Sequence, residues 1–296
     1  MKRLHISIFI FSFALIVILM GCSKERLLNI YYSLPLLNKY LQNKQQTEQI
    51  FNITEPSSRP IIGAKGTALY VSKDIFMYPN GDSVSYPFSI GLIELYSPKD
   101  RIYYGISSVA DNDILATAGD LRIRAFKNSD ELVLRPGASY KLETASLKST
   151  DEKAKIYHGT GTPPYVTWAV STDTVNIIDS KYQGYISKMG WINFAYHFQN
   201  TVNNSKLVFT SSVGDTLSQV GIYVYLPETQ TLLTWGADSL YPIHDSTSIE
   251  VVSIAVDTQD KLYKFFQKRV VSTTNTIELD FTETTDEELT KILESL

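Results

Sequence analysis

The chain has 296 residues, with 27 Lys or Arg, 31 Asp or Glu and a single Cys, so its formal net charge is −4. This acidic balance, with no basic block, argues against a nucleic-acid-binding protein, because phosphate contacts need clustered positive charge. One cysteine excludes an intramolecular disulfide framework, and the length suffices for one large or two ordinary domains.

Residues 1–21 have the pattern of a signal peptide. Lys2 and Arg3 precede an apolar run over residues 6–20, which is too short for a comfortable membrane span. The run ends in Leu19-Met20-Gly21-Cys22, which resembles the bacterial lipobox. The sequence therefore predicts lipidation of Cys22 rather than a buried free cysteine. The protein would then be an outer-membrane lipoprotein of the cell envelope, either facing the periplasm or exposed at the surface.

Residues 22–50 are predicted to form a lipidated tether with helical character. Leu27, Leu28, Tyr31 and Leu34 fall at helical spacing, and Pro35 interrupts the pattern before it resumes. One interpretation is an amphipathic segment lying on the lipid surface. The other is a helix packed against the first domain.

Residues 51–144 are predicted to form a first β-sandwich domain. Short alternating runs are separated by turns such as Pro79-Asn80-Gly81. In residues 121–125, the three apolar side chains share one strand face and the two arginines share the other. We therefore expect half-buried antiparallel strands with the arginines in water.

Residues 145–164 are predicted to be an inter-domain linker, because they are charged, small and then rich in Gly and Pro. Residues 165–296 are predicted to form a second β domain, with strands over residues 166–170, 191–198, 206–210, 220–226, 231–235, 249–256 and 276–281. The domain is expected to end in a helix. Thr285 and Glu288 have capping-box spacing, and an apolar stripe follows at Leu289, Ile292, Leu293 and Leu296. The predicted fold is thus mainly β, with two β-sandwich-like domains, an N-terminal helical tether and a short C-terminal helix.

Several short motifs resemble a family of uncharacterised Bacteroidota lipoproteins. They are Gly66-Thr67, Glu94-Leu95, Asp100-Arg101-Ile102, residues 115–119, Ile123-Arg124-Ala125 and Glu131-Leu132. The family's first domain is similar to the β-sandwich of ankyrins, netrin receptors and zonula-occludens proteins. Its second domain often carries Gly-Trp-Ile-Asn-x-Asp, which residues 190–195 match except that Ala195 replaces the acid. The resemblance implies a fold and an envelope location but no activity.

The sequence shows no catalytic or cofactor motif. His158, His197 and His244 lack the spacing of a zinc site, and no nucleophile elbow or phosphate-binding glycine loop is present. We therefore expect a protein that is not an enzyme and has no cofactor. A polysaccharide-active enzyme stays open, because carboxylates on different strands pair only in space.

Two sets of residues are candidates for ligand binding. Tyr103, Tyr104, Tyr182 and Tyr185 lie in or beside predicted turns, where exposed rings could stack on sugars, although tyrosine also simply suits strands. Asp111 and Asp113 could contribute oxygen ligands to calcium, but solvated turn residues are the favoured interpretation.

Five Asp-Ser or Asp-Thr pairs match the O-glycosylation pattern of exported proteins in the bacterial group that the motifs resemble. The hydroxyl residues are Ser83, Thr174, Thr216, Ser239 and Ser246. The same pairs are ordinary in turns and helix caps, because their side chains bond the local backbone.

Together these features predict a lipid-anchored cell-envelope protein that acts as a non-catalytic binding or structural surface module. Its partners would be the membrane, through the lipid on Cys22, and a glycan or another envelope protein. The alternatives are a glycan-binding lipoprotein of a polysaccharide-uptake system and a polysaccharide-active enzyme.

Overall fold

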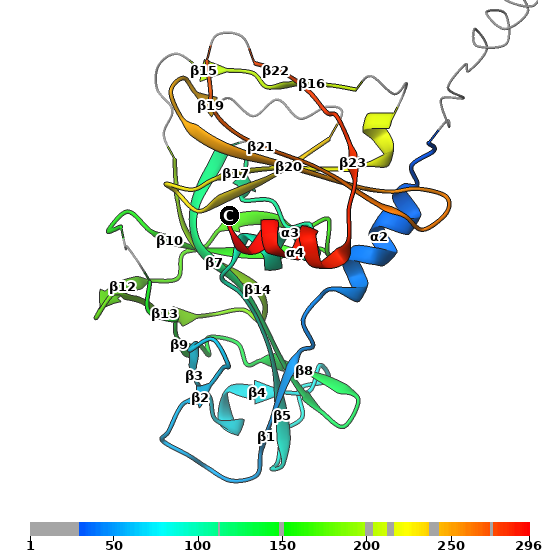
Figure 1. Ribbon diagram of the computed structural model, residues 1–296. Helices are drawn as coiled ribbons and strands as arrows, with labels where there is room; N and C mark the ends of the chain where they lie inside the picture. The colour runs from blue at the N-terminus through cyan, green and yellow to red at the C-terminus, as the bar shows by residue number, and fades with distance from the viewer. Residues whose placement is uncertain are drawn as a thin grey trace, which may run out of the picture. The chain divides into compact units, whose positions relative to one another are not determined.

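The computed structural model describes residues 30–111, 113–147, 151–198, 204–211, 216–236, 243–272 and 275–296 (Figure 1). The expected signal peptide and the lipidation site at Cys22 lie outside these ranges. Residues 32–296 form one compact unit. Within the described ranges, no helix is long and apolar enough to cross a membrane.

The expected mainly β fold is confirmed, and its largest part is a sandwich of two antiparallel sheets. The first sheet has the order β1 (Gln49–Ile53), β5 (Phe88–Leu95), β7 (Asp113–Lys127), β14 (Gly190–His197), β10 (Lys155–Thr160) and β11 (Thr167–Val170), with β4 (Phe76–Met77), β6 (Val109–Ala110) and β8 (Asp130–Leu134) attached beside this path. The second has the order β12 (Val175–Ile178), β13 (Lys181–Ile186), β9 (Tyr140–Glu143), β3 (Ala68–Tyr70) and β2 (Ile61–Ile62).

The two sheets enclose one hydrophobic core. Ile123 and Ile192 from the first sheet and Leu69 and Leu142 from the second are all fully buried in it. In β7 the alternation predicted for residues 121–125 is confirmed, since the apolar side chains are buried and the two arginines are half-exposed. The two-residue period of the strand thus sets which face meets the core.

The strand pairing departs from the expected division into domains at residues 145–164. β10 lies inside this expected linker and pairs with β14, which in turn pairs with β7 of the expected first domain. The sequence pattern does not reveal β10, because both faces of this strand are covered. Ile156 lies in the sandwich core, and Tyr157 lies in a second hydrophobic cluster with Trp168 and Trp191. A strand that is buried on both faces has no apolar-polar alternation to reveal it.

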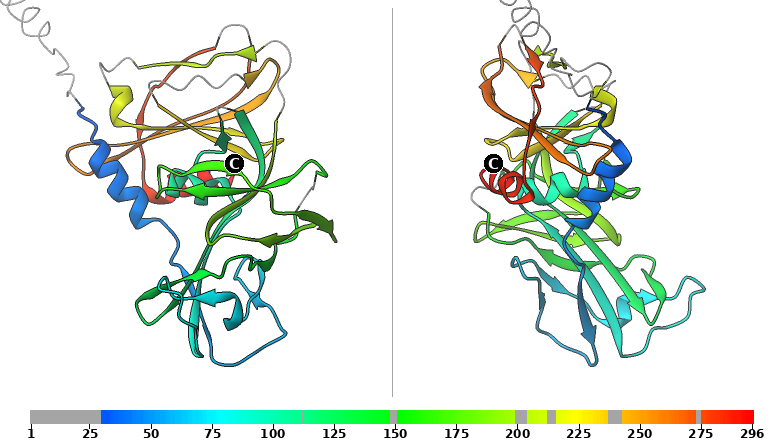
Figure 2. Two further views of the ribbon diagram at one scale, coloured as in Figure 1. Left: turned by 180° about the vertical axis from the view of Figure 1, so that it is seen from behind. Right: turned by 45° about the vertical axis from the view of Figure 1, so that its right-hand side comes forward.

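The C-terminal part of the chain forms a further antiparallel sheet covered by three helices. Its order is β18 (Thr231–Trp235), β17 (Gly221–Leu226), β20 (Ser248–Val256), β21 (Leu262–Val270) and β23 (Thr282–Glu283). The helices α2 (Leu34–Asn43), α3 (Pro98–Tyr104) and α4 (Asp286–Glu294) share one apolar cluster with it, and Figures 1 and 2 show them on the same side of the sheet. The remaining elements are η1 (Lys73–Ile75), η2 (Thr216–Gln219), and the strand pairs β15 (Asn204–Ser205) with β19 (Ile243–His244) and β16 (Val208–Thr210) with β22 (Thr276–Glu278).

Helix α4 follows the sequence prediction. Thr285 and Glu288 form the capping box, and Leu289 and Leu293 are buried in the cluster beneath the sheet. Ile292 and Leu296 are half-buried beside them. The local pattern predicts this helix because its cap and its apolar stripe lie within one stretch of chain.

Helix α2 is packed on protein, but on the C-terminal sheet rather than on the first sandwich. Leu37 and Leu41 are buried in the helix-covered cluster. Pro35 lies in the first turn, where its missing N–H costs no hydrogen bond, so it starts the helix instead of breaking it. Asp286 of α4 accepts hydrogen bonds from Tyr40 Oη at 2.8 Å and Lys44 Nζ at 2.6 Å.

Candidate functional site

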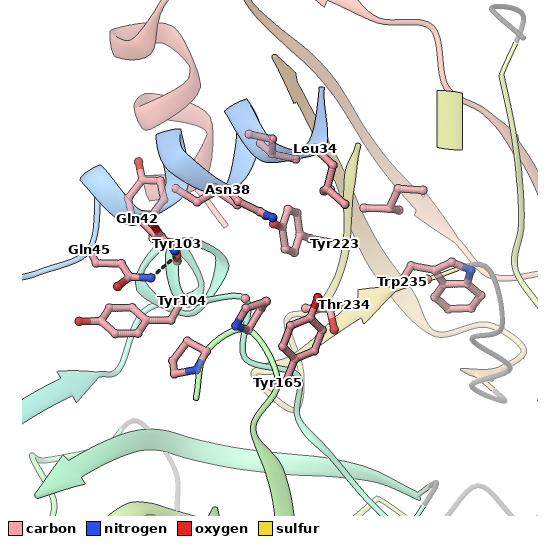
Figure 3. Close-up of a pocket in the computed structure, with 18 of the residues that line it drawn as sticks. Leu34, Asn38, Gln42, Gln45, Tyr103, Tyr104, Tyr165, Tyr223, Thr234 and Trp235 are labelled. Atoms are coloured by element: carbon pink, nitrogen blue, oxygen red, sulfur yellow. Dashed lines mark hydrogen bonds between the residues drawn. The ribbon is translucent and has the colours of Figure 1, made fainter. Parts of the chain in front are cut away.

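A pocket of about 640 Å³ lies where helix α2 meets the rest of the unit (Figure 3). Its other walls come from the end of α3, the loop between β10 and β11, the start of β17 and the end of β18. We call it the α2 pocket. Its volume falls in the range of about 300–1,000 Å³ that is usual for small-molecule sites.

Helix α2 presents amide side chains to the pocket. Because the helix turns every 3.6 residues, Leu37 and Leu41 enter the core while Asn38 and Gln42 follow them on the pocket side. Asn38 and Gln42 are exposed, and their side chains make no hydrogen bond to the described part of the chain. Gln45 also lines the pocket, and its Nε2 donates to the Tyr103 carbonyl at 3.1 Å. Two amide groups are therefore free to bind a ligand.

The loop between β10 and β11 presents Tyr165, which is 80% exposed. The Tyr165 N–H donates to the Thr162 carbonyl at 2.8 Å and closes a tight turn. Gly161 has φ +97°, and a Cβ added there would lie 2.2 Å from the Tyr165 carbonyl oxygen. Pro164 packs over Gly105, the left-handed cap of α3, where an added Cβ would lie 2.5 Å from the Pro164 Cβ. Both contacts require glycine, so they fix the backbone of the turn that carries Tyr165.

The remaining aromatic residues form the inner wall of the pocket. Tyr103, Tyr104 and Tyr223 are largely buried and line it beside Trp235. Burial raises the pKa of Tyr104 to about 12, against the opposite effect of Arg122, and burial also raises the pKa of Tyr223. Both phenols are therefore neutral at neutral pH. Figure 3 shows α2 along one side, with Tyr165 and Thr234 on the opposite side.

The α2 pocket is chemically neutral. In the part of the chain that the structure describes, its lining includes no acid, lysine, arginine or histidine. It offers aromatic faces, amides and hydroxyl groups. This set suits an uncharged ligand and supplies neither a proton donor and acceptor pair nor a counter-charge for an anion.

Ionisable side chains line two other pockets. Asp151 and Glu228 lie in a pocket of about 240 Å³ with Tyr182 and Tyr196, and Asp151 Oδ1 accepts a hydrogen bond from the Lys153 N–H at 2.7 Å. A third pocket of about 540 Å³ is lined by Lys153, Lys155, Tyr157, Tyr196, His197 and Phe198. Carboxylates for acid–base chemistry on a sugar are thus found outside the α2 pocket.

The structure separates the four tyrosines considered for sugar stacking. Tyr103 and Tyr104 are buried, so they contribute to a pocket wall rather than to an exposed platform. Tyr182 is buried in the sandwich core and stacks on Phe194, with ring centroids 5.8 Å apart. Tyr185 is 49% exposed and lies on β13, outside the α2 pocket.

The pocket residues Asn38, Gln42 and Tyr165 were not found by sequence reasoning. The one available signal was Pro163-Pro164 beside a tyrosine, because two prolines hold the following side chain in a restricted loop. The Gly-Pro-rich composition of residues 159–164 instead predicts part of a linker.

Asp111 and Asp113 flank the turn between β6 and β7. Asp111 has positive φ there, and the exposed Asp113 carboxylate lies 3.5 Å from His197 Nδ1. Among the described residues, no three or more His, Cys, Asp or Glu side chains gather as metal ligands. Asp111 thus lies in the turn and Asp113 is the first residue of β7, so neither belongs to a metal-ligand cluster among the described residues.

Three of the five predicted O-glycosylation positions can be located. Ser83, Thr174 and Ser246 are exposed, and the Ser83 hydroxyl accepts a hydrogen bond from Arg135 Nη2 at 2.9 Å. The Thr216 side chain and Ser239 lie outside the described residues. Glycosylation of these positions stays a prediction.

A buried ion pair lies between the sandwich and the helix-covered sheet. Arg101 Nε lies 3.3 Å from Asp120 Oδ2, both side chains are 1% exposed, and Arg101 Nη1 donates to the Gln230 carbonyl at 2.5 Å. Neither carboxylate oxygen of Asp120 makes a hydrogen bond within the described residues. Burial raises the pKa of Asp120 to about 6, against the lowering effect of Arg101.

Comparisons of the chain with protein-family models, curated proteins and solved structures find no match. The likeness to Bacteroidota lipoproteins stays a prediction from the motifs. Any function proposed for the protein therefore rests on the residues and geometry of the α2 pocket rather than on a relative of known function.

Proposed function

We propose that the protein is a lipid-anchored cell-envelope protein that binds a neutral ligand in the α2 pocket and catalyses no reaction. The observation that carries this proposal is the pocket itself. It has the volume of a ligand site, a highly exposed Tyr165 and two amide side chains without protein partners. Its described lining offers binding groups but no acid–base pair.

The envelope location is supported by the export signal and by Gly21-Cys22. Leu34, the first residue of α2, is twelve positions after Cys22, and an extended chain spans at most about 3.6 Å per residue. A lipid on Cys22 would thus hold the pocket wall within roughly 40 Å of the membrane surface.

The experiment measures ligand-induced stabilisation of the full-length lipoprotein, purified from its host in detergent. Envelope material separated into neutral polysaccharide, acidic polysaccharide, peptide and lipid fractions is added, and thermal unfolding is followed by tryptophan fluorescence. A bound ligand raises Tm because it stabilises only the folded state. We expect one uncharged fraction to raise Tm.

The matched variants are Asn38→Trp, which fills the α2 pocket, and Lys39→Trp, which places the same ring on an exposed position outside its lining. Lys39→Trp should respond like the wild type and Asn38→Trp should not. The proposal is overturned if no fraction raises Tm or if both variants respond equally. Labelling with a radioactive fatty acid tests the anchor, since Cys22→Ala should abolish incorporation.

A polysaccharide-active enzyme is the second candidate, favoured by Asp151 and Glu228 in one pocket. It predicts that the protein releases reducing ends from an envelope polysaccharide and that Glu228→Gln stops the release. The proposed binding function predicts no release by the wild type.

A further inference from the structure

We infer that the ligand of the α2 pocket is a neutral glycan, with the Tyr165 ring stacked on one sugar and the amides of Asn38 and Gln42 bonded to its hydroxyl groups. This inference rests on the proposed function of the same pocket and names the class of ligand. It is carried by the combination of an exposed aromatic ring, unpartnered amides and a neutral lining.

The Tyr165 ring is suited to covering a sugar face. One face of a pyranose ring is mostly C–H surface, which an aromatic ring can remove from water. Tyr165 is exposed for 80% of its surface although it stands in a tight turn held by Gly161 and by the packing of Pro164 on Gly105. A ring on a constrained backbone loses less conformational entropy on binding than a ring on a mobile loop, because only its side-chain rotamers remain to be ordered.

The two amides are suited to the edge of the same sugar. Asn38 and Gln42 are four residues apart on α2, which places them about 6 Å apart along the helix axis. Each amide offers one acceptor oxygen and two donor N–H groups. Because every sugar hydroxyl is both donor and acceptor, two neighbouring hydroxyls can bond to the oxygen and the N–H group of one amide. The spacing of Asn38 and Gln42 is similar to the width of one sugar ring.

Charged ligands and extended peptides fit this pocket less well. The described lining carries no charge to match an anion or a cation. A peptide that binds as an added strand needs a free sheet edge. The outer edge of β18 is already occupied, because the Ser108 N–H donates to the Leu232 carbonyl at 2.7 Å and the Thr234 N–H donates to Ser107 Oγ at 3.2 Å.

The first test treats the stabilising envelope fraction with periodate, which cleaves vicinal diols, or with protease. We expect periodate to abolish the rise in Tm and protease to leave it unchanged. The opposite pattern identifies a peptide and overturns the glycan inference while the binding function stands. If no fraction raises Tm at all, it is the proposed function that fails.

The second test measures the affinity of neutral gluco-, manno- and galacto-oligosaccharides by calorimetry. We expect at least one to bind, with Tyr165→Ala weakening it about 3- to 10-fold through lost stacking. Tyr165→Phe should keep the affinity, and Asn38→Leu, similar in size but without hydrogen-bonding groups, should weaken it about 10-fold. Tyr185→Ala, an exposed tyrosine outside the pocket, is the control and should bind as the wild type does. If no oligosaccharide binds, or if Tyr165→Ala and Asn38→Leu both bind as the wild type does, the inference is wrong.

Discussion

Glu94 shows how one buried side chain can organise three segments of the sandwich. Its carboxylate accepts hydrogen bonds from Gln49 Nε2 at 2.8 Å, the Lys65 N–H at 2.9 Å and the Thr67 N–H at 3.0 Å. A buried charge is tolerated only where its lone pairs are used in this way. Glu94 and Thr67 both belong to the motifs that resemble the lipoprotein family, so those motifs have a structural explanation that requires no activity.

The buried carboxylate of Asp120, in contrast, accepts no hydrogen bond within the described residues. Its raised pKa predicts that the stability of the fold depends on pH. Its pKa of about 6 in the folded state lies above the ordinary 3.8, because burial disfavours the ionised form. A raised carboxyl pKa contributes stability that is present below about pH 3.8 and is lost as the pH rises through 6.

Asp120→Asn keeps the shape of the neutral acid and should remove this dependence. As the pH rises from 3.5 to 7, the free energy of unfolding of Asp120→Asn should increase by on the order of 3 kcal/mol relative to that of the wild type. The reason is that one pKa unit is worth about 1.4 kcal/mol. Urea unfolding of both proteins at several pH values measures it. A difference that is constant with pH would contradict the assignment.

At the scale of elements, α4 seals the helix-covered cluster through Leu289 and Leu293, which are 0% and 1% exposed. Leu293→Asp places a carboxylate in that cluster, so the free energy of unfolding should fall by on the order of 2–4 kcal/mol. Leu293→Met, which nearly conserves volume, should cost less than about 1.5 kcal/mol. Thermal unfolding compares them, and an unchanged Tm for Leu293→Asp would show that the helix contributes no stability.

The loop that carries Tyr165 predicts a separation of stability from binding. Gly161 and Gly137 both have positive φ, but an added Cβ meets the Tyr165 carbonyl only at Gly161 and meets nothing within 4 Å at Gly137. Backbone strain should cost each Gly→Ala variant about 1–2 kcal/mol of stability, and the contact with the Tyr165 carbonyl adds to that cost at Gly161. Only Gly161→Ala should also weaken ligand binding in the α2 pocket. Calorimetry and thermal unfolding of both variants test this, and equal affinities would show that the turn does not position Tyr165.

Sequence reasoning succeeds here where the determining residues are neighbours in the chain. The cap and stripe of α4 and the alternation at residues 121–125 are local, and both are confirmed. β10 and the packing partner of α2 were missed, because covered strand faces carry no period and helix partners are chosen by the whole fold. The candidate site was missed for the same reason. Its walls come from five segments spread between Leu34 and Gly236, and Asn38 and Tyr165 are 127 positions apart in the chain, so no sequence spacing brings them together.

At the scale of the whole molecule, strands from both halves of the chain share one sheet. β14 lies between β7 and β10 in the first sheet. The C-terminal sheet is covered by helices α2 and α3, which come from the N-terminal part of the chain. A fragment of residues 165–296 would therefore expose strand edges and apolar faces that the complete chain covers.

We predict that this fragment does not fold alone, whereas a chain of residues 30–296 does. The measurement is amide dispersion in a two-dimensional NMR spectrum, together with the cooperativity of urea unfolding. A dispersed spectrum and a cooperative transition for residues 165–296 would establish an independent second domain.

The attachment of α2 to α4 has a consequence for biogenesis. Lys44 and its partner Asp286 are 242 residues apart, and synthesis and export both deliver a chain from its N-terminus. Helix α2 therefore emerges long before the sheet and helix α4 that share its apolar cluster, so its apolar face is uncovered during that interval. A chain that ends before α4 lacks Leu289 and Leu293, which complete the apolar cluster, and lacks Asp286, which accepts the hydrogen bonds from Tyr40 and Lys44. Under the proposed function, ligand binding in the α2 pocket would be restricted to chains whose synthesis and translocation have finished.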